Sequence, residues 1–349
     1  MRNVAAEGAP WPGAVGVSGG GDSVALMLLL AAWARSTGER PPVVLSVDHG
    51  LQRESAHQAS HVADRARAHG LESHVLRWSG RKPGSDIEAA AREARYRLCG
   101  EWCCSNRIGG LYVAHTIDDQ AETFLLRLAR GSGVDGLSCM STVSSLPIPR
   151  MENVTLVRPL LNIPRSMLRN YLLSRKEPWL EDAMNTDPRF GRARLRAVWP
   201  ALTAAGLTSV RIADACRHLA RARDTLQEAT GSLLARIARI EPHKAWVDGA
   251  ELGSAPEEIG LRALADLLMH ISGRVYRPRF ARLEALLAAV RSGGLGGGRT
   301  LHGCRIRPFQ RKDAVFGAGT ISIGREAARR GTMGQPRREP TPEGGHDGY

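Results

Sequence analysis

Hydroxyl, carboxylate and glycine residues lie together near the start of the chain, in the stretch AVGVSGGGDSVALMLLL at residues 14–30. Three consecutive glycines allow a ligand to approach closely, so that their N–H groups and the start of the following helix can surround an anion. Asp22 would repel a bare phosphate, and its presence favours a phosphate that carries a divalent cation. The loop therefore predicts a nucleotide site with Mg²⁺, for which Asp22 is a candidate ligand. The residues expected to hold the nucleotide are Ser18, Gly19, Gly20, Gly21, Asp22 and Ser23.

Two common nucleotide motifs do not describe this loop. No Gly-Lys-Ser/Thr sequence follows it, as a Walker A loop requires, and it does not match the G-x-G-x-x-G dinucleotide fingerprint. A plain glycine-rich turn, with Asp22 as a helix cap, is the alternative. An apolar strand before the loop and an apolar helix after it favour the phosphate site.

A second group of chemically active side chains lies in HTIDDQAET, residues 115–123. Asp119 and Glu122 are three positions apart in the first turn of a predicted helix, and His115 ends the strand before it. Two carboxylates beside the phosphate loop can hold Mg²⁺ or accept the ammonium group of a cationic substrate. Asp119 is therefore the second candidate metal ligand. In the alternative interpretation these carboxylates only complement the helix dipole, with Asp118 as the helix cap.

Short apolar runs alternate with longer segments of helical periodicity in the first half of the chain. The runs at residues 43–47, 73–78 and 111–114 are expected to be buried strands. This alternation predicts an α/β fold in which a parallel sheet has helices on both faces. Such sheets bind ligands at the carboxyl ends of their strands, where we expect the glycine loop to lie. His49 follows a second strand, and either contacts the nucleotide or base or has a structural role.

Composition limits the class of protein. A length of 349 residues predicts about two domains, and a formal net charge of +13 favours a nucleic acid partner. The alternative is an arginine-rich soluble protein whose charge has no such meaning. No apolar run approaches the roughly 18 residues of a membrane span, and the six cysteines have no secretory context. We expect a cytoplasmic protein with reduced thiols and no membrane partner.

Several motifs, in order over residues 14–200, resemble those of one family. SGGGDS matches the loop of the PP-loop pyrophosphatases, which cleave ATP between its α and β phosphates. The motifs VDHG, EAAAREARY, AHTIDDQAETFLLRLARGSGVDGL, VRPLL and EDAMNTD resemble those of the tRNA(Ile)-lysidine synthetases. The resemblance implies a PP-loop, adenine nucleotide alpha hydrolase-like fold that uses ATP and Mg²⁺. It further implies adenylation of the wobble cytidine in an isoleucine tRNA with a CAU anticodon, followed by attack of free L-lysine to form lysidine.

The resemblance also implies roles for individual residues. Arg95, immediately before Tyr96, matches an active-site arginine of the family, and a guanidinium suits a phosphoryl or adenylate charge. The candidate catalytic residues are Asp22, Arg95, His115, Asp119 and Glu122. The family has an arginine-rich stretch after its N-T-D segment, and this position holds the candidate tRNA contacts, Asn185, Arg192, Arg194 and Arg196. For these arginines a solvated helix face or a pair with a neighbouring glutamate is the alternative.

Three regions follow from these patterns. Residues 1–208 are expected to form the ATP-binding and catalytic domain. Residues 209–325 predict a smaller, mainly helical domain with a hairpin near residues 299–309, and the resemblance implies that this domain binds tRNA. The polar residues 326–349 predict a disordered tail. A homodimer is left open.

Two other functions are weighed against this one. A tRNA thiolation enzyme would also use a PP-loop, but it requires paired cysteines, and Cys99, Cys103 and Cys104 share a predicted helix with poor spacing for a metal. A noncatalytic RNA-binding protein explains the basic charge but not the acidic residues of the loop and of residues 115–123. The sequence therefore favours an ATP-dependent ligase.

Overall fold

The computed structural model describes residues 8–51, 54–80, 82–83, 86–181, 191–274, 276–308 and 315–326. The chain divides into two compact units, Met1–Arg223 and Asp224–Tyr349, and the division falls within helix α9 (Ser209–Ile237). The domain boundary expected from the sequence, between residues 208 and 209, falls at the start of the same helix. Apart from Glu326, the expected disordered tail lies outside the described residues.

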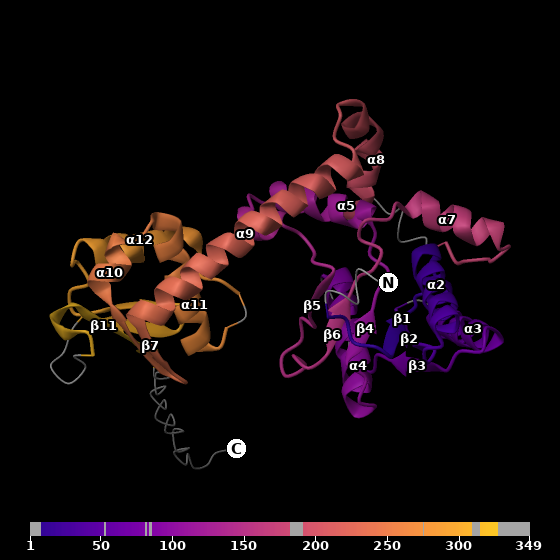
Figure 1. The fold of residues 1–349 in the computed structure, drawn as a ribbon, viewed down its shortest axis with the longest axis horizontal. Coiled ribbons are helices and arrows are strands. Elements are labelled where there is room, and N and C mark those ends of the chain that lie inside the picture. The colour runs from indigo at the N-terminus through magenta and orange to yellow at the C-terminus, as the bar shows by residue number, and fades with distance from the viewer. Residues whose placement is uncertain are drawn as a thin grey trace, which may run out of the picture. The chain divides into compact units, whose positions relative to one another are not determined.

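The first unit is built on a six-stranded sheet with the strand order β3-β2-β1-β4-β6-β5 (Figure 1). Neighbouring strands are parallel, except that the edge strand β5 is antiparallel to β6. The strands are β1 (Gly13–Gly16), β2 (Val43–Asp48), β3 (Ser73–Arg77), β4 (Gly110–Tyr112), β5 (Val143–Ser145) and β6 (Thr155–Val157). The expected α/β fold is confirmed, and the three expected strands are β2, β3 and β4.

Helices cover both faces of this sheet. Successive strand residues point to opposite faces, so Val15 packs with α2 and α3 in one hydrophobic cluster while Ala14 packs with α4 in another. The helices of this unit that precede α9 are α2 (Gly21–Thr37), α3 (Ser55–Ala68), α4 (Ile87–Ser105), α5 (Ile117–Leu128), α6 (Val134–Leu137), α7 (Arg165–Ser174) and α8 (Gly191–Ala204). Two separate apolar layers therefore hold the sheet rigid between its helices.

The order of the strands determines where a ligand can bind. From β1 the chain continues to β2 and β3 on one side and then returns to β4 on the other side of β1. Open α/β sheets bind ligands at such a reversal, outside the carboxyl ends of the two strands. The glycine loop follows β1, and residues 115–123 follow β4. The topology thus brings together the two groups of residues that are separated by about a hundred positions in the sequence.

The second unit contains helices and an antiparallel sheet with the order β7-β8-β11-β10-β9. Its elements are β7 (Ala238–Glu241), β8 (Lys244–Asp248), α10 (Gly249–Ser254), α11 (Glu257–Ser272), α12 (Phe280–Arg291), β9 (Arg299–Leu301), β10 (Cys304–Arg307), η3 (Gly317–Gly319) and β11 (Thr320–Arg325). The expected hairpin is β9–β10, whereas β7, β8 and β11 extend the sheet beyond it. In the described ranges no helix is long and apolar enough to cross a membrane.

Candidate active site

The glycine loop joins β1 to α2, with Gly20 as the N-cap of the helix. Because glycine has no side chain, no capping group covers the first helical turn, where N–H groups can meet an anion. Gly19 has a φ of +91°, a conformation that residues with a Cβ rarely adopt. Ser23 Oγ donates to Gly20 O at 2.8 Å and accepts from Ser18 N at 3.2 Å. The two serines therefore fix the curvature of the loop.

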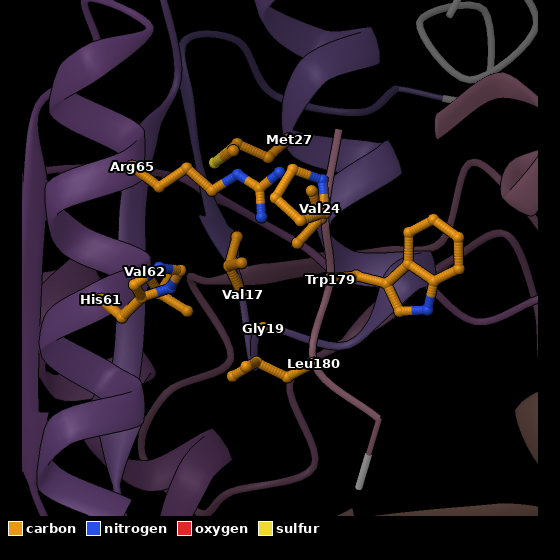
Figure 2. Close-up of a pocket in the computed structure, with 10 residues that line it drawn as sticks. Val17, Gly19, Val24, Met27, His61, Val62, Arg65, Trp179 and Leu180 are labelled. Carbon is orange, nitrogen blue, oxygen red and sulfur yellow. The ribbon is translucent and has the colours of Figure 1, made fainter. Parts of the chain in front are cut away.

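The segment at residues 178–180 packs against the loop. Leu180 N donates to Gly19 O at 3.0 Å. A Cβ on Gly19 would lie only 2.7 Å from Leu180 Cδ1 and 3.2 Å from Val62 Cγ2, so a side chain at this position would force its neighbours to move. A cavity of about 120 Å³ is lined by Gly19, by Leu180, by apolar side chains of α2 and by His61, Val62 and Arg65 of α3 (Figure 2). The loop conformation thus depends on glycine at this position for both its φ angle and its packing.

The three candidate carboxylates converge on one guanidinium, that of Arg165 at the start of α7. Arg165 Nε donates to Asp22 Oδ2 at 2.8 Å, and Arg165 Nη2 donates to Asp119 Oδ1 at 3.2 Å. Arg165 Nη1 lies 4.0 Å from Glu122 Oε1. The side chains of Asp119 and Glu122 are only 9% and 4% exposed. Acidic groups from the glycine loop and from α5 therefore lie within reach of a single cation.

Asp119 also takes part in the start of α5. Its Oδ2 accepts from Thr116 N and from Thr116 Oγ1, both at 2.8 Å, in a capping box whose N-cap is Thr116. The alternative interpretation of Asp118 as the cap is wrong. Asp118 instead accepts from Arg165 N at 2.8 Å and from Ser209 Oγ at 3.1 Å. Asp119 thus uses Oδ2 for the helix cap and Oδ1 for Arg165, and Asp118 fixes the beginning of α7 beside it.

The electrostatics of this group favour a bound cation. Burial raises the pKa of Asp22 above its ordinary value, and the nearby charge of Asp119 adds to the rise despite Arg165. Burial also acts to raise the pKa of Asp119, but Arg165 and the hydrogen bonds from Thr116 outweigh it, and the pKa is lowered. The same carboxylates raise the pKa of Arg165 against the opposing effect of burial. The arginine is therefore firmly charged.

The pair of aspartates fits the expected magnesium ion by its donor chemistry. Asp22 and Asp119 each direct a carboxylate oxygen at the Arg165 guanidinium, and Mg²⁺, which is commonly held by one or two carboxylates together with phosphate oxygens, would have to take the place of that guanidinium. Within the described ranges, no cluster of three or more His, Cys, Asp or Glu residues could hold a metal unaided. Oxygens of a nucleotide would have to complete such a site.

Glu122 also contacts the arginine-rich helix α8. Arg196 Nε donates to Glu122 Oε1 at 2.6 Å and Arg196 Nη2 to Glu122 Oε2 at 3.3 Å, while Arg192 Nε lies 3.9 Å from Oε2. Arg194 is exposed on the same helix. Asn185 lies outside the described residues. Two of the candidate tRNA contacts are thus adjacent to a candidate catalytic carboxylate.

The remaining candidate residues, His115, His49 and Arg95, lie at the ends of β4 and β2 and on α4. His115 follows β4 and is 9% exposed, and burial together with Arg92 lowers its pKa to about 3. His49 follows β2, and burial together with Arg95 lowers its pKa to about 4. Arg95 lies on α4 with its guanidinium carbon 5.6 Å from the centre of the Tyr96 ring. Both histidines are therefore neutral at pH 7 in this environment.

Arg165 is the site residue that the sequence interpretation missed. The VRPLL motif ends four residues before it, and Pro164 is the N-cap of α7, so a proline marked a helix start at this point. That signal places an arginine in a first helical turn. It does not reveal the carboxylates, which are 43 or more positions away in sequence.

The cysteines of α4 differ from those of a sulfur-transfer site. Cys99 and Cys103 are buried, and burial raises the pKa of each thiol to about 12. Thiolates, not thiols, are the nucleophiles and metal ligands, so these two residues are suited to packing rather than chemistry. Cys104 is exposed.

The sheet, the glycine loop after β1 and the neighbouring carboxylates define an ATP-binding domain of the PP-loop class, and the family model of the PP-loop domain matches residues 11–202. A tRNA(Ile)-lysidine synthase of Ruegeria pomeroyi is 39% identical over 83% of this chain and 70% of its own length. The chain belongs to the tRNA(Ile)-lysidine synthase family of enzymes.

Other relatives carry the same name. The tRNA(Ile)-lysidine synthase of Wolbachia pipientis wMel is 37% identical over 94% of this chain and 74% of its own length. That of Methylobacterium nodulans is 37% identical over 91% of this chain and 93% of its own length. Among solved structures, the U34-tRNA thiolase NcsA from Methanococcus maripaludis is 15% identical, with a TM-score of 0.49 over 59% of this chain and 71% of that chain.

Proposed function

We propose that the protein ligates lysine to the 2-position of the wobble cytidine of an isoleucine tRNA with a CAU anticodon, converting ATP to AMP and pyrophosphate. The product is lysidine, which changes the codon read to AUA and the tRNA identity from methionine to isoleucine. The observation that carries the proposal is the convergence of Asp22, Asp119 and Glu122 on one cation beside the glycine loop. A phosphate-binding loop next to buried carboxylates suits a reaction in which ATP activates one substrate and a cationic amine is bound for the attack that follows. The relatives' names support tRNA as the substrate.

In the first step the 2-oxo group of the cytidine attacks the α phosphorus of ATP, and the bond to pyrophosphate breaks. The backbone of the glycine loop, with Ser18 and Ser23, would hold the departing phosphates. Asp22 and Asp119 would hold Mg²⁺, which when bound neutralises charge on the pyrophosphate. The tRNA leaves this step as an adenylate, in which the former 2-oxo oxygen is bonded to phosphorus.

In the second step the ε-amine of lysine attacks carbon 2 and AMP departs with that oxygen. Lysine arrives as an ammonium ion, and the buried carboxylates of Asp119 and Glu122 can accept it. Because guanidinium groups of Arg165 and Arg196 occupy these oxygens, the ammonium must displace at least one of them. A carboxylate can then take the proton that the amine loses before it attacks.

A single reaction mixture tests this proposal. The protein is incubated with ATP, radiolabelled lysine and a transcript of the isoleucine tRNA, and AMP, pyrophosphate and labelled tRNA are measured. We expect AMP and labelled tRNA to form together only when both lysine and tRNA are present. A transcript with uridine at the wobble position is the matched control and should stay unlabelled. Steady AMP formation without RNA, or labelling of the control transcript, would contradict the proposal.

The conformation of Gly19 provides a prediction about the nucleotide loop. We expect Gly19→Ala to weaken ATP binding roughly 10-fold or more, because strain at a positive φ costs about 1 to 3 kcal/mol and the new Cβ would collide with Leu180. Isothermal titration calorimetry with ATP and thermal unfolding measure the effect. In the control Gly20→Ala, φ is −67° and the nearest atom to the new Cβ is 3.6 Å away, so its melting temperature should be unchanged. Wild-type ATP affinity and stability in Gly19→Ala would show that the loop does not need this conformation.

A further inference from the structure

Three arginines lie together near Tyr96. Arg92 and Arg95 come from α4, and their guanidinium carbons lie 5.2 and 5.6 Å from the centre of the Tyr96 ring. Arg158 follows β6 and interacts electrostatically with Tyr96 and Arg92. Among the described residues, none of these three arginines forms an ion pair with a carboxylate. We call Arg92, Arg95 and Arg158 the arginine cluster.

Buried polar atoms in and beside the arginine cluster lack hydrogen-bond partners in the described part of the chain. These atoms are Arg95 Nε, Arg158 Nε, the Tyr96 hydroxyl and His115 Nδ1. Arg158, Tyr96 and His115 are only 7%, 3% and 9% exposed. Because roughly nine in ten buried polar groups in folded proteins have a partner, four exceptions in one region indicate an absent ligand.

Arg158 is anchored within the fold. Its Nη1 donates to Ser141 O at 2.8 Å and to Ser144 Oγ at 3.0 Å. These bonds hold the side chain in the interior, although burial and the charge of Arg92 lower its pKa below the ordinary value. A buried charge without a counter-ion is costly, and several like charges together are more so. The fold therefore maintains a positive site whose balancing charge is not among the described residues.

We propose that the arginine cluster is a buried phosphate-binding site, completed by hydrogen bonds from Tyr96 and His115. Guanidinium groups suit phosphate because their fixed donors match two of its oxygens at once. The neutral His115 ring can donate one further hydrogen bond without adding charge. Arg158, which belongs to the VRPLL motif but was given no role from the sequence alone, is the anchored member of the site.

The position of the cluster connects it to the reaction. Asp119, which holds Arg165, also interacts electrostatically with Arg92 and with His115. Arg158 follows β6 and His115 follows β4, so the phosphate site lies at the carboxyl ends of these strands, within electrostatic reach of Asp119. The phosphate group can belong to ATP or to the RNA backbone beside the target nucleotide. The assignment of the phosphate to ATP or to RNA rests on the proposed function, whereas the proposal that the arginine cluster binds a phosphate group does not.

Binding measurements on charge-removing variants test the site. Arg158→Gln and Arg95→Gln are titrated with inorganic pyrophosphate by calorimetry, and with the tRNA transcript at several salt concentrations. The control is Arg97→Gln, on the same helix, whose side chain is 42% exposed and paired with Glu101. We expect the two test variants to bind one of the probes roughly 10- to 100-fold more weakly, as expected for lost charge-assisted hydrogen bonds, while the control binds like the wild type.

The two probes distinguish the sources of phosphate. Weaker pyrophosphate binding assigns the site to ATP, whereas weaker tRNA binding with a smaller salt slope and unchanged pyrophosphate binding assigns it to the RNA backbone. Wild-type affinity of both variants for both probes would overturn the proposal. If Arg158→Gln does not fold, Arg95→Gln decides alone, since Arg95 is only half-buried. If the wild-type protein binds pyrophosphate but incorporates no lysine into tRNA, that result contradicts the proposed function but does not contradict the phosphate site.

Discussion

Replacing Asp119 by Asn or Glu122 by Gln should lower the rate of lysine incorporation into tRNA at least roughly 100-fold, with the protein still folded. Each amide keeps the shape of the carboxylate but removes the charge that binds the ammonium group of lysine or, for Asp119, a metal ion. A contact to a charged group contributes about 1.5 to 3 kcal/mol, and the amides can also no longer take up a proton. The same loss is expected for Asp22→Asn.

The kinetic parameters should separate the roles of these carboxylates. For Glu122→Gln we expect a higher KM for lysine and unchanged ATP binding, because its carboxylate contacts only arginines of α7 and α8 in the described structure. For Asp22→Asn we expect weaker binding of ATP with magnesium, since Asp22 belongs to the glycine loop. Circular dichroism verifies that each variant is folded.

Two matched variants serve as controls for this prediction. Glu93→Gln removes an exposed carboxylate of α4 and should incorporate lysine like the wild type. Asp118→Asn weakens the contacts to Arg165 N and Ser209 Oγ, so it should lower the free energy of unfolding by about 1 kcal/mol. Near-normal turnover in all three variants at Asp22, Asp119 and Glu122 would refute the assignment of the site.

The sequence was sufficient to predict the parts of the site that depend on local pattern. The glycine loop lies between an apolar strand and an apolar helix, and residues 115–123 follow another apolar run, so the α/β periodicity alone placed both at strand ends. Their adjacency follows from the strand order, in which β4 pairs with β1. The resemblance to the lysidine synthetases added Arg95 and the candidate tRNA contacts at Arg192, Arg194 and Arg196.

Long-range ion pairs could not be predicted in the same way. Arg165 and Glu122 are 43 positions apart, and Arg196 and Glu122 are 74 apart, with several other arginines nearby that a pattern cannot distinguish. The contacts of Arg158 could not be predicted for the same reason. An arginine within the apolar motif VRPLL indicates an anchored charge, but the motif does not identify the groups that the arginine contacts. The ion pairs of Arg165 and Arg196 depend on how α8 packs against α5 and α7 against α2, which local periodicity does not encode.

The C-terminal sheet was only partly predicted, for a different physical reason. Residues 209–237 have strong helical periodicity, and β7 follows at residue 238 with no glycine or proline between them. Because no turn residue separates the helix from the strand, the sequence does not mark where the helix ends and the strand begins. The β9–β10 hairpin, in contrast, follows the glycine-rich residues 293–298 and was expected.

The double variant Arg192→Ala with Arg196→Ala should have two opposite effects on substrate binding. Affinity for tRNA should fall, and the slope of log affinity against log salt should decrease by about one for each lost phosphate contact. Affinity for free lysine in the absence of tRNA should rise, because the variant frees Glu122 from the guanidinium groups that compete with the ammonium of lysine. We expect this rise to be on the order of 10-fold, comparable with the loss of one charge-assisted hydrogen bond.

Equilibrium dialysis with labelled lysine and filter binding with the transcript measure the two effects separately. Arg194→Ala is the matched control, since Arg194 is exposed on the same helix, whereas Arg192 and Arg196 both lie within 4 Å of Glu122. It should weaken tRNA binding without altering lysine binding. ATP binding without tRNA should survive in both variants, because the glycine loop and its carboxylates keep all their groups. A collapse of ATP affinity in the double variant would instead assign Arg192 and Arg196 to the nucleotide site, and unchanged lysine affinity would show that Arg196 does not compete for Glu122.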